Sequence, residues 1–212
     1  DGPAIQAANL RALYSGASLR GTLAMVSRFR ENNNDTPVIL MGYFNPIYQY
    51  GPSRFVTDAA AAGVDGLIMV DLPPEEDDEL CDPARTAGLH WVRLVTPTSD
   101  EARLQQVLRN TSGFIYYVSI AGITGTRSAT ATAIGDALTM IRKHTALPIA
   151  VGFGINTADQ VRETGEVADG ALVGSAIIRE IENHLVGSGK AKPELLDRVT
   201  GLVSELAGGL RA

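Results

Sequence analysis

The fold class is indicated most clearly by Leu147–Ile155, which reads LPIAVGFGI. Its apolar run, Ile149–Val151, is too short for a helix and is typical of a strand buried on both faces of a parallel sheet. Gly152 and Gly154 follow at once, where the backbone must turn sharply or approach another group closely. The stretch therefore predicts a buried strand that ends in a tight turn.

The same pattern recurs at Asp169–Ser175, which reads DGALVGS and runs directly into the apolar residues 176–178. Gly174 and Ser175 are expected to open a helix there, and the free N–H groups at a helix N-terminus bind anions. In a (β/α)8 barrel, the loops after the last two strands are the usual phosphate site. Either turn alone could be an ordinary strand-to-helix connection. Together, in consecutive units, the two turns favour a phosphate site.

Similar apolar runs occur along the whole chain, and strands are predicted to begin near residues 37, 66, 91, 114, 148 and 170. Amphipathic helical stretches separate them, which predicts a parallel sheet covered by helices. A doubly wound sheet and a barrel both fit, but polar and glycine residues follow every strand, which favours the barrel. We therefore expect residues 1–212 to form a single α/β domain, a (β/α)8 TIM barrel. It should be incomplete at the N-terminus, with the first two strands and first helices absent.

The composition narrows the possible functions. The chain has 212 residues, is 45% hydrophobic and carries a formal net charge of -6, which argues against a surface for nucleic acid or an anionic membrane. Its single cysteine, Cys81, excludes an internal disulfide and suits the cytoplasm. No apolar run approaches the roughly 20 residues of a membrane helix. No cluster of residues has metal-ligand spacing, so we expect no metal site.

Two further features are ambiguous from the residues alone. Ser119–Thr130 is a polar, glycine-containing loop that could be a mobile lid or a plain surface loop. Asp71 precedes two prolines, and capping the helix that follows is a commoner role for it than catalysis. Several apolar residues at alternating strand positions could line a pocket for a flat aromatic ligand, or belong to the core. These are Met41, Ile68, Val70, Leu94 and Phe153.

A series of short motifs carries a resemblance to a known family. They are DGPAIQ at 1–6, YFNP at 43–46, DLPPEE at 71–76, GITG at 122–125, GFGI at 152–155 and VGSAI at 173–177. In order and spacing along the whole chain, they resemble the tryptophan synthase α subunit. The resemblance implies a barrel lyase that splits indole-3-glycerol phosphate into indole and glyceraldehyde 3-phosphate. It also implies an α2β2 heterotetramer with a β subunit that holds pyridoxal phosphate and uses the indole in tryptophan biosynthesis, with no cofactor in this chain.

The resemblance also assigns roles to individual residues. Asp1 matches the catalytic aspartate that contacts the indole N–H, Thr124 matches the lid threonine that binds this aspartate, and Tyr116 matches the pocket tyrosine. Asn45 and Pro73 match loops at the β-subunit interface. The residues that match the phosphate and ring contacts are Gly125, Gly152, Phe153, Gly154, Gly174 and Ser175.

Other functions remain open at this point. The family's second catalytic carboxylate is a glutamate. It lies on a strand before the aspartate, in a part of the family sequence that the 212 residues do not contain. The chain could instead be a stand-alone indole-3-glycerol-phosphate lyase, or a sugar-phosphate isomerase or epimerase. Without the upstream glutamate, it could also be a non-catalytic subunit that binds phosphate and a partner.

Overall fold

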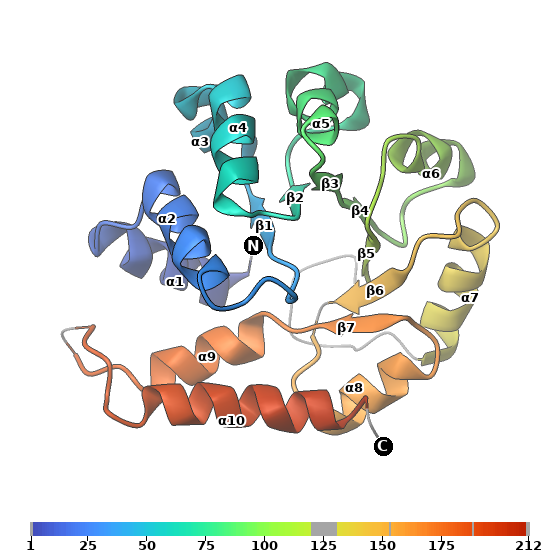
Figure 1. The fold of residues 1–212 in the computed structure, drawn as a ribbon. Helices are drawn as coiled ribbons and strands as arrows, with labels where there is room; N and C mark the ends of the chain where they lie inside the picture. The colour runs from blue at the N-terminus through green and yellow to red at the C-terminus, as the bar shows by residue number, and fades with distance from the viewer. Residues whose placement is uncertain (1, 120–130, 153, 188, 211–212) are drawn as a thin grey trace.

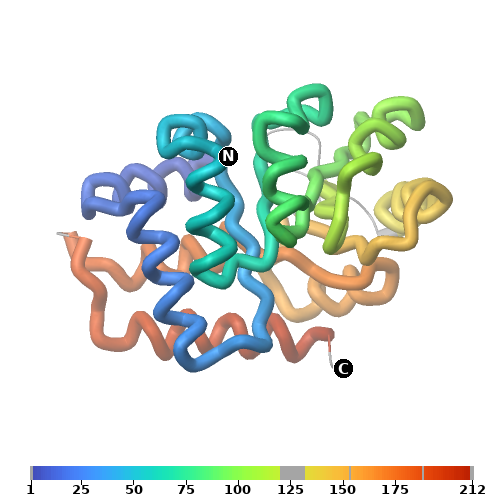
Figure 2. The backbone as a smooth tube through the Cα atoms, turned by 45° about the horizontal axis from the view of Figure 1, so that its top comes forward, coloured from blue at the N-terminus to red at the C-terminus, as the bar shows by residue number. Residues whose placement is uncertain are grey.

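The computed structural model describes residues 2–119, 131–152, 154–187 and 189–210, and Figures 1 and 2 show their helices forming an outer arc around the strands. The strands are β1 (Ile39–Gly42), β2 (Gly66–Met69), β3 (His90–Trp91), β4 (Arg93–Val95), β5 (Ile115–Val118), β6 (Ile149–Gly152) and β7 (Gly170–Leu172). The helices are α1 (Pro3–Tyr14), α2 (Leu19–Arg30), α3 (Phe44–Tyr50), α4 (Pro52–Ala62), α5 (Asp77–Thr86), α6 (Glu101–Leu108), α7 (Ala131–Ile141), α8 (Ala158–Gly165), α9 (Ser175–Asn183) and α10 (Leu195–Gly208), with a 3-10 turn η1 at Pro74–Glu76.

All pairings between these strands are parallel and follow chain order, as the sequence predicted. The predicted third strand differs, because it is divided at Val92 into β3, which pairs with β2, and β4, which pairs with β5. The Val92 N–H still donates to the Leu67 carbonyl at 2.9 Å, so the backbone passes from one neighbour to the other without losing this bond. The strands therefore form two ladders, β1-β2-β3 and β4-β5-β6-β7, joined at Val92.

The two faces of the sheet differ in their environment. Side chains alternate along a strand, and residues paired in parallel register share a face. The outer face packs under the helices in two apolar clusters, one containing Leu67 and Trp91, the other Val95, Tyr117 and Val151. The inner face carries the alternate residues, and its carboxyl edge is where barrel enzymes place their sites.

Local sequence signals account for where several helices begin. Ser18 caps α2 by accepting from the Gly21 N–H at 3.2 Å. Asp100 caps α6 in the same way, by accepting from the Arg103 N–H at 2.8 Å. Helix α3 has Pro46 in its first turn, where a proline loses no hydrogen bond and is tolerated.

Carboxylates at the amino edge tie neighbouring strands together. Asp65, just before β2, accepts from the Val38 N–H at 2.6 Å and from the Arg30 guanidinium. Asp169, just before β7, accepts from the Ile149 N–H at 2.9 Å. The Ile149 hydrogen bond holds the pKa of Asp169 below its ordinary value, with a further contribution from Arg142. These bonds fix each strand against the one that precedes it.

Candidate active site

The candidate site lies on the inner face, towards the carboxyl edge of the sheet. Leu94, Tyr116 and Ala150 are paired in register across β4, β5 and β6, so they stand at one level of that face. Val118 and Gly152 are paired at the next level, closer to the carboxyl edge. Because Tyr116 belongs to this face, the structure places the predicted pocket tyrosine beside the predicted glycine strand.

Tyr116 occupies the space that a side chain on Gly152 would need. A Cβ added to Gly152 would lie 2.7 Å from the Tyr116 hydroxyl oxygen and 2.9 Å from Cζ, closer than real contacts allow. Burial of the ring raises the pKa of Tyr116, so the phenol is neutral at pH 7. Gly152 is thus needed here for a close approach rather than for an unusual backbone angle.

Ser119 fixes the end of β6 and was not singled out from the sequence, where it read only as the start of a loop. Its backbone N–H and its hydroxyl both donate to the Gly152 carbonyl, each at 3.1 Å, and the residue is buried. A hydroxyl directly after a buried strand was the available signal. Ser119 therefore holds Gly152 in place under Tyr116.

The two glycine turns at the carboxyl edge lead to helices that differ in whether a side chain caps their N-terminal N–H groups. Gly154 has φ +84°, in the left-handed region, and leads to α8, whose N-terminus is closed by a capping box between Thr157 and Gln160. Within the part of the chain that the structure describes, helix α9 begins after Gly174 with no side-chain cap, and no atom beyond Gly174 and its two chain neighbours lies within 4 Å of a Cβ added to Gly174. The start of α9, with Ser175 as its first residue, is therefore the more accessible anion position.

The remaining predicted lining residues also belong to the inner face, but they differ in burial. Met41 is paired with Ile68 in register, and Val70 follows at the same parity. Ile68 is buried, whereas Met41 is 52% and Val70 36% exposed. Asp1, Thr124, Gly125 and Phe153, and the predicted lid beyond Ser119, lie outside the described residues.

Asn45 and Pro73, the predicted partner contacts, are both exposed at the ends of the neighbouring strands β1 and β2. Asp71 links the segments that carry them, because its carboxylate accepts from the Phe44 N–H, next to Asn45 at the start of α3, at 2.8 Å. The sequence interpretation of Asp71 as a cap of its own following helix was therefore wrong, since Asp71 bonds the first residue of α3 instead. The bond from the Phe44 N–H to Asp71 thus joins the two segments that carry the exposed residues Asn45 and Pro73.

A cavity of about 300 Å³ lies between the ends of β4 and β5 and helix α7. Its lining includes Val95 and Tyr117, which belong to the outer face, and also Ser119, so the cavity borders the candidate site at the residue that holds Gly152. Among the described residues, no group of His, Cys, Asp and Glu could hold a metal ion. None of the described helices is long and apolar enough to cross a membrane.

Comparison with known proteins identifies relatives over the whole chain. The family model for the tryptophan synthase alpha chain matches residues 1–206. The tryptophan synthase α subunit of Legionella pneumophila str. Paris is 36% identical with a TM-score of 0.88, over 100% of this chain and 76% of that one. A chain from a Mycobacterium tuberculosis tryptophan synthase structure is 31% identical with a TM-score of 0.83, over 100% and 76%.

A chain from the Pyrococcus furiosus tryptophan synthase α2β2 complex is 34% identical with a TM-score of 0.82, over 98% of this chain and 80% of that one. Agreement at this level along the chain confirms the predicted α/β barrel class. It also agrees with the motif series at both ends of the sequence. The chain therefore belongs to the tryptophan synthase alpha chain family.

Proposed function

We propose that this chain, as a single barrel domain, cleaves indole-3-glycerol phosphate into indole and glyceraldehyde 3-phosphate. Membership of a lyase family supports the reaction class. The observation that carries the proposal is the uncapped start of α9 at Gly174, on the same edge of the sheet as Tyr116 and Gly152. An anion position beside an inner face with an aromatic ring suits a substrate with a phosphate at one end and an indole at the other.

Each group has a distinct role in this proposal. The N–H groups near Gly154, Gly174 and Ser175 bind the phosphate, together with Gly125, and the inner face around Tyr116 receives the indole. Asp1 stabilises the positive charge that develops on the indole nitrogen when the ring carbon is protonated. Thr124 orients the Asp1 carboxylate.

Breaking the carbon–carbon bond also requires two proton transfers. The indole carbon must gain a proton, and the glycerol hydroxyl must lose one so that its oxygen becomes the carbonyl of glyceraldehyde 3-phosphate. In the family resemblance, this work involves a glutamate ahead of Asp1. We therefore expect indole release to require both the Asp1 carboxylate and that glutamate.

We further propose that the chain works in the cytoplasm with a β subunit, which holds pyridoxal phosphate and receives the indole. Two observations support this partner. A similar chain is part of the Pyrococcus furiosus α2β2 complex. Asn45, in the first turn of α3, and Pro73, after β2, are both exposed, and Asp71 joins their segments through its bond to the Phe44 N–H, which suits a shared contact surface.

The test is indole release from indole-3-glycerol phosphate by the complete native protein and its Asp1→Asn, Thr124→Val and double variants. Loss of the Asp1 charge should lower kcat by ~10²–10³, by analogy with removal of an oxyanion donor. Thr124→Val should cost less, and the double variant should lose less than the product of the two factors. Multiplicative losses would show that the two residues act independently. Phosphate binding without any indole release would instead support the non-catalytic alternative.

A further inference from the structure

Arg93 is a buried charged residue on the outer face of β4, where the pattern of a buried parallel strand favours an apolar residue. It is 5% exposed, and its guanidinium carbon lies 5.3 Å from the centre of the Trp91 ring. Burial lowers the pKa of Arg93 to about 10, so the side chain is still charged at neutral pH. A buried charge of this kind is tolerated only where specific partners compensate it.

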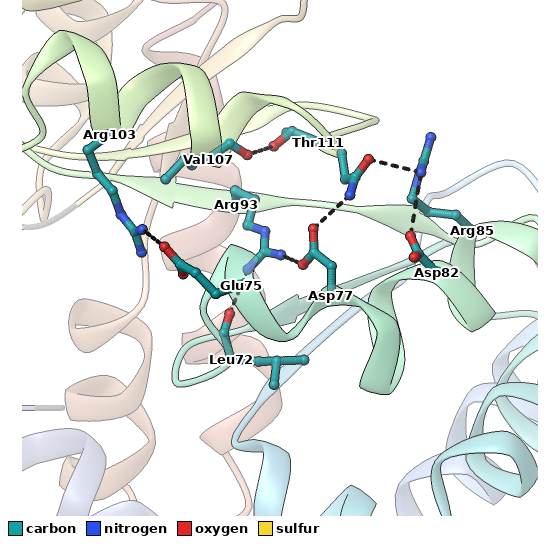
Figure 3. Close-up of polar contacts among 10 residues, drawn as sticks. Leu72, Glu75, Asp77, Asp82, Arg85, Arg93, Arg103, Val107 and Thr111 are labelled. Carbon is teal, nitrogen blue, oxygen red and sulfur yellow. Dashed lines mark hydrogen bonds and ion pairs between the residues drawn. The ribbon is translucent and has the colours of Figure 1, made fainter.

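The partners of Arg93 lie at the two ends of one short segment, Leu72–Asp77, which follows β2 (Figure 3). One terminal nitrogen, Nη1, donates to the Leu72 carbonyl at 2.5 Å, and the other, Nη2, donates to Asp77 Oδ1. Within the described residues, the remaining nitrogen, Nε, makes no hydrogen bond. The hydrogen bonds of this guanidinium are thus directed to the start and the end of a single segment.

The segment is braced from its sides as well. Asp77 Oδ2 accepts from Asn110 Nδ2 at 2.8 Å, and Arg103 on α6 donates to Glu75 in the turn η1. The ion pair between Arg93 and Asp77 is buried, whereas the side chains of Arg103 and Glu75 are 39% and 54% exposed. Exposed ion pairs contribute little, so the buried Arg93 contacts set the shape of the segment.

The outward side of this segment carries Pro73, directly after the carbonyl that Arg93 holds. Binding a partner through a segment that is already ordered avoids the entropy cost of ordering it on association. We propose that Arg93 is a positioning residue for partner binding, which fixes Leu72–Asp77 so that Pro73 meets the β subunit. This inference rests on the proposed function, which supplies the partner.

The test compares β-subunit binding by Arg93→Gln, Arg93→Lys and the parent, in the complete native protein at a temperature where circular dichroism shows each to be folded. Arg93→Gln should weaken the Kd for the β subunit roughly tenfold, as expected for a strong interface residue. Arg93→Lys keeps the charge and one donor for the Leu72 carbonyl, so it should recover part of the affinity. The KM for indole-3-glycerol phosphate without the β subunit should shift far less than the Kd.

Arg142 offers a matched control, because it also donates to one carbonyl, that of Val167 at 3.1 Å, and to one carboxylate, that of Asp169 at 3.2 Å. These contacts are at the amino edge, away from Pro73, so Arg142→Gln should leave the Kd for the β subunit unchanged. In a Pro73→Ala background, the effect of Arg93→Lys on the Kd should shrink, because the contact that Arg93 positions is already lost.

A folded Arg93→Gln variant that binds the β subunit as tightly as the parent overturns this inference alone. The same holds if Arg93→Lys changes the Kd as much in the Pro73→Ala background as it does in the parent. A parent protein that does not bind the β subunit overturns the proposed function and this inference with it. Should Arg93→Gln fail to fold, Asp77→Asn and Arg93→Lys carry the same comparison, since each weakens the contact between residues 93 and 77 and leaves a donor for the Leu72 carbonyl.

Discussion

At the amino edge of the sheet, carboxylates accept hydrogen bonds from neighbouring strands, whereas at the carboxyl edge glycines let a side chain approach closely or leave a helix start open. Asp65 and Asp169 accept amide hydrogen bonds at the first edge. Gly152 and Gly174 stand at the second edge, one under a tyrosine ring and one at an uncapped helix. This difference indicates that the amino edge stabilises the sheet and the carboxyl edge supplies the chemistry. Substitutions at the two edges should therefore have separable effects.

The largest effect is expected at Gly152, because its substitution removes space that Tyr116 already fills. Gly152→Ala in the complete native protein should displace the ring and lower kcat/KM for indole release about 10²-fold. Gly135→Ala is the control, since a Cβ on Gly135, in α7, would make an ordinary contact of 3.8 Å with Val167 Cγ1. Parent-like activity of Gly152→Ala would mean that the ring can move aside without affecting the site.

The second effect tests the amino edge. Asp65→Ala removes the acceptor of the Val38 N–H and the charge opposite Arg30, and should lower the free energy of unfolding by about 2 kcal/mol. Urea unfolding measures this change. Asp159→Ala, which removes only an exposed ion pair with Arg162, should stay within about 0.5 kcal/mol of the parent. Equal losses in the two variants would contradict the role given to Asp65.

The third effect returns to the carboxyl edge and tests the difference between its two helix starts. Ser175→Asp places a negative charge at the open start of α9 and should weaken glycerol 3-phosphate binding about tenfold or more, measured by titration calorimetry. Thr157→Asp adds the same charge at α8, where the capping box already uses the N-terminus, and should change the affinity much less. Similar losses in both variants would show that the two starts are not distinct.

The smallest effect concerns pH. The lowered pKa of Asp169 means that its carboxylate stabilises the folded state fully above the unfolded value of about 3.9 and loses this contribution as the pH falls through the folded value. The parent should therefore lose more stability than Asp169→Asn between about pH 5 and pH 3, measured by urea unfolding across that range. If the free energy of unfolding falls equally with pH in the two proteins, the pKa of Asp169 is not lowered by folding.

Sequence periodicity predicted the order and direction of the strands, because buried parallel strands are apolar and separated by regular helical lengths. It also located the helix start at Ser175, which depends on residues close in the chain. Contacts between distant residues were beyond it. The bond from Asp71 to the Phe44 N–H and the Arg93 clamp on Leu72 each join separate βα units, and no local pattern marks them.

The division of the third strand at Val92 also affects how the molecule opens. Buried apolar residues before the division, up to Trp91, form one cluster, and those from Val95 onward form another. Local opening follows contiguous units that share buried contacts. We expect amide protons of β1 and β2 to exchange with solvent deuterium as one group and those of β5 and β6 as another. Resistance to exchange is then a property of each half separately.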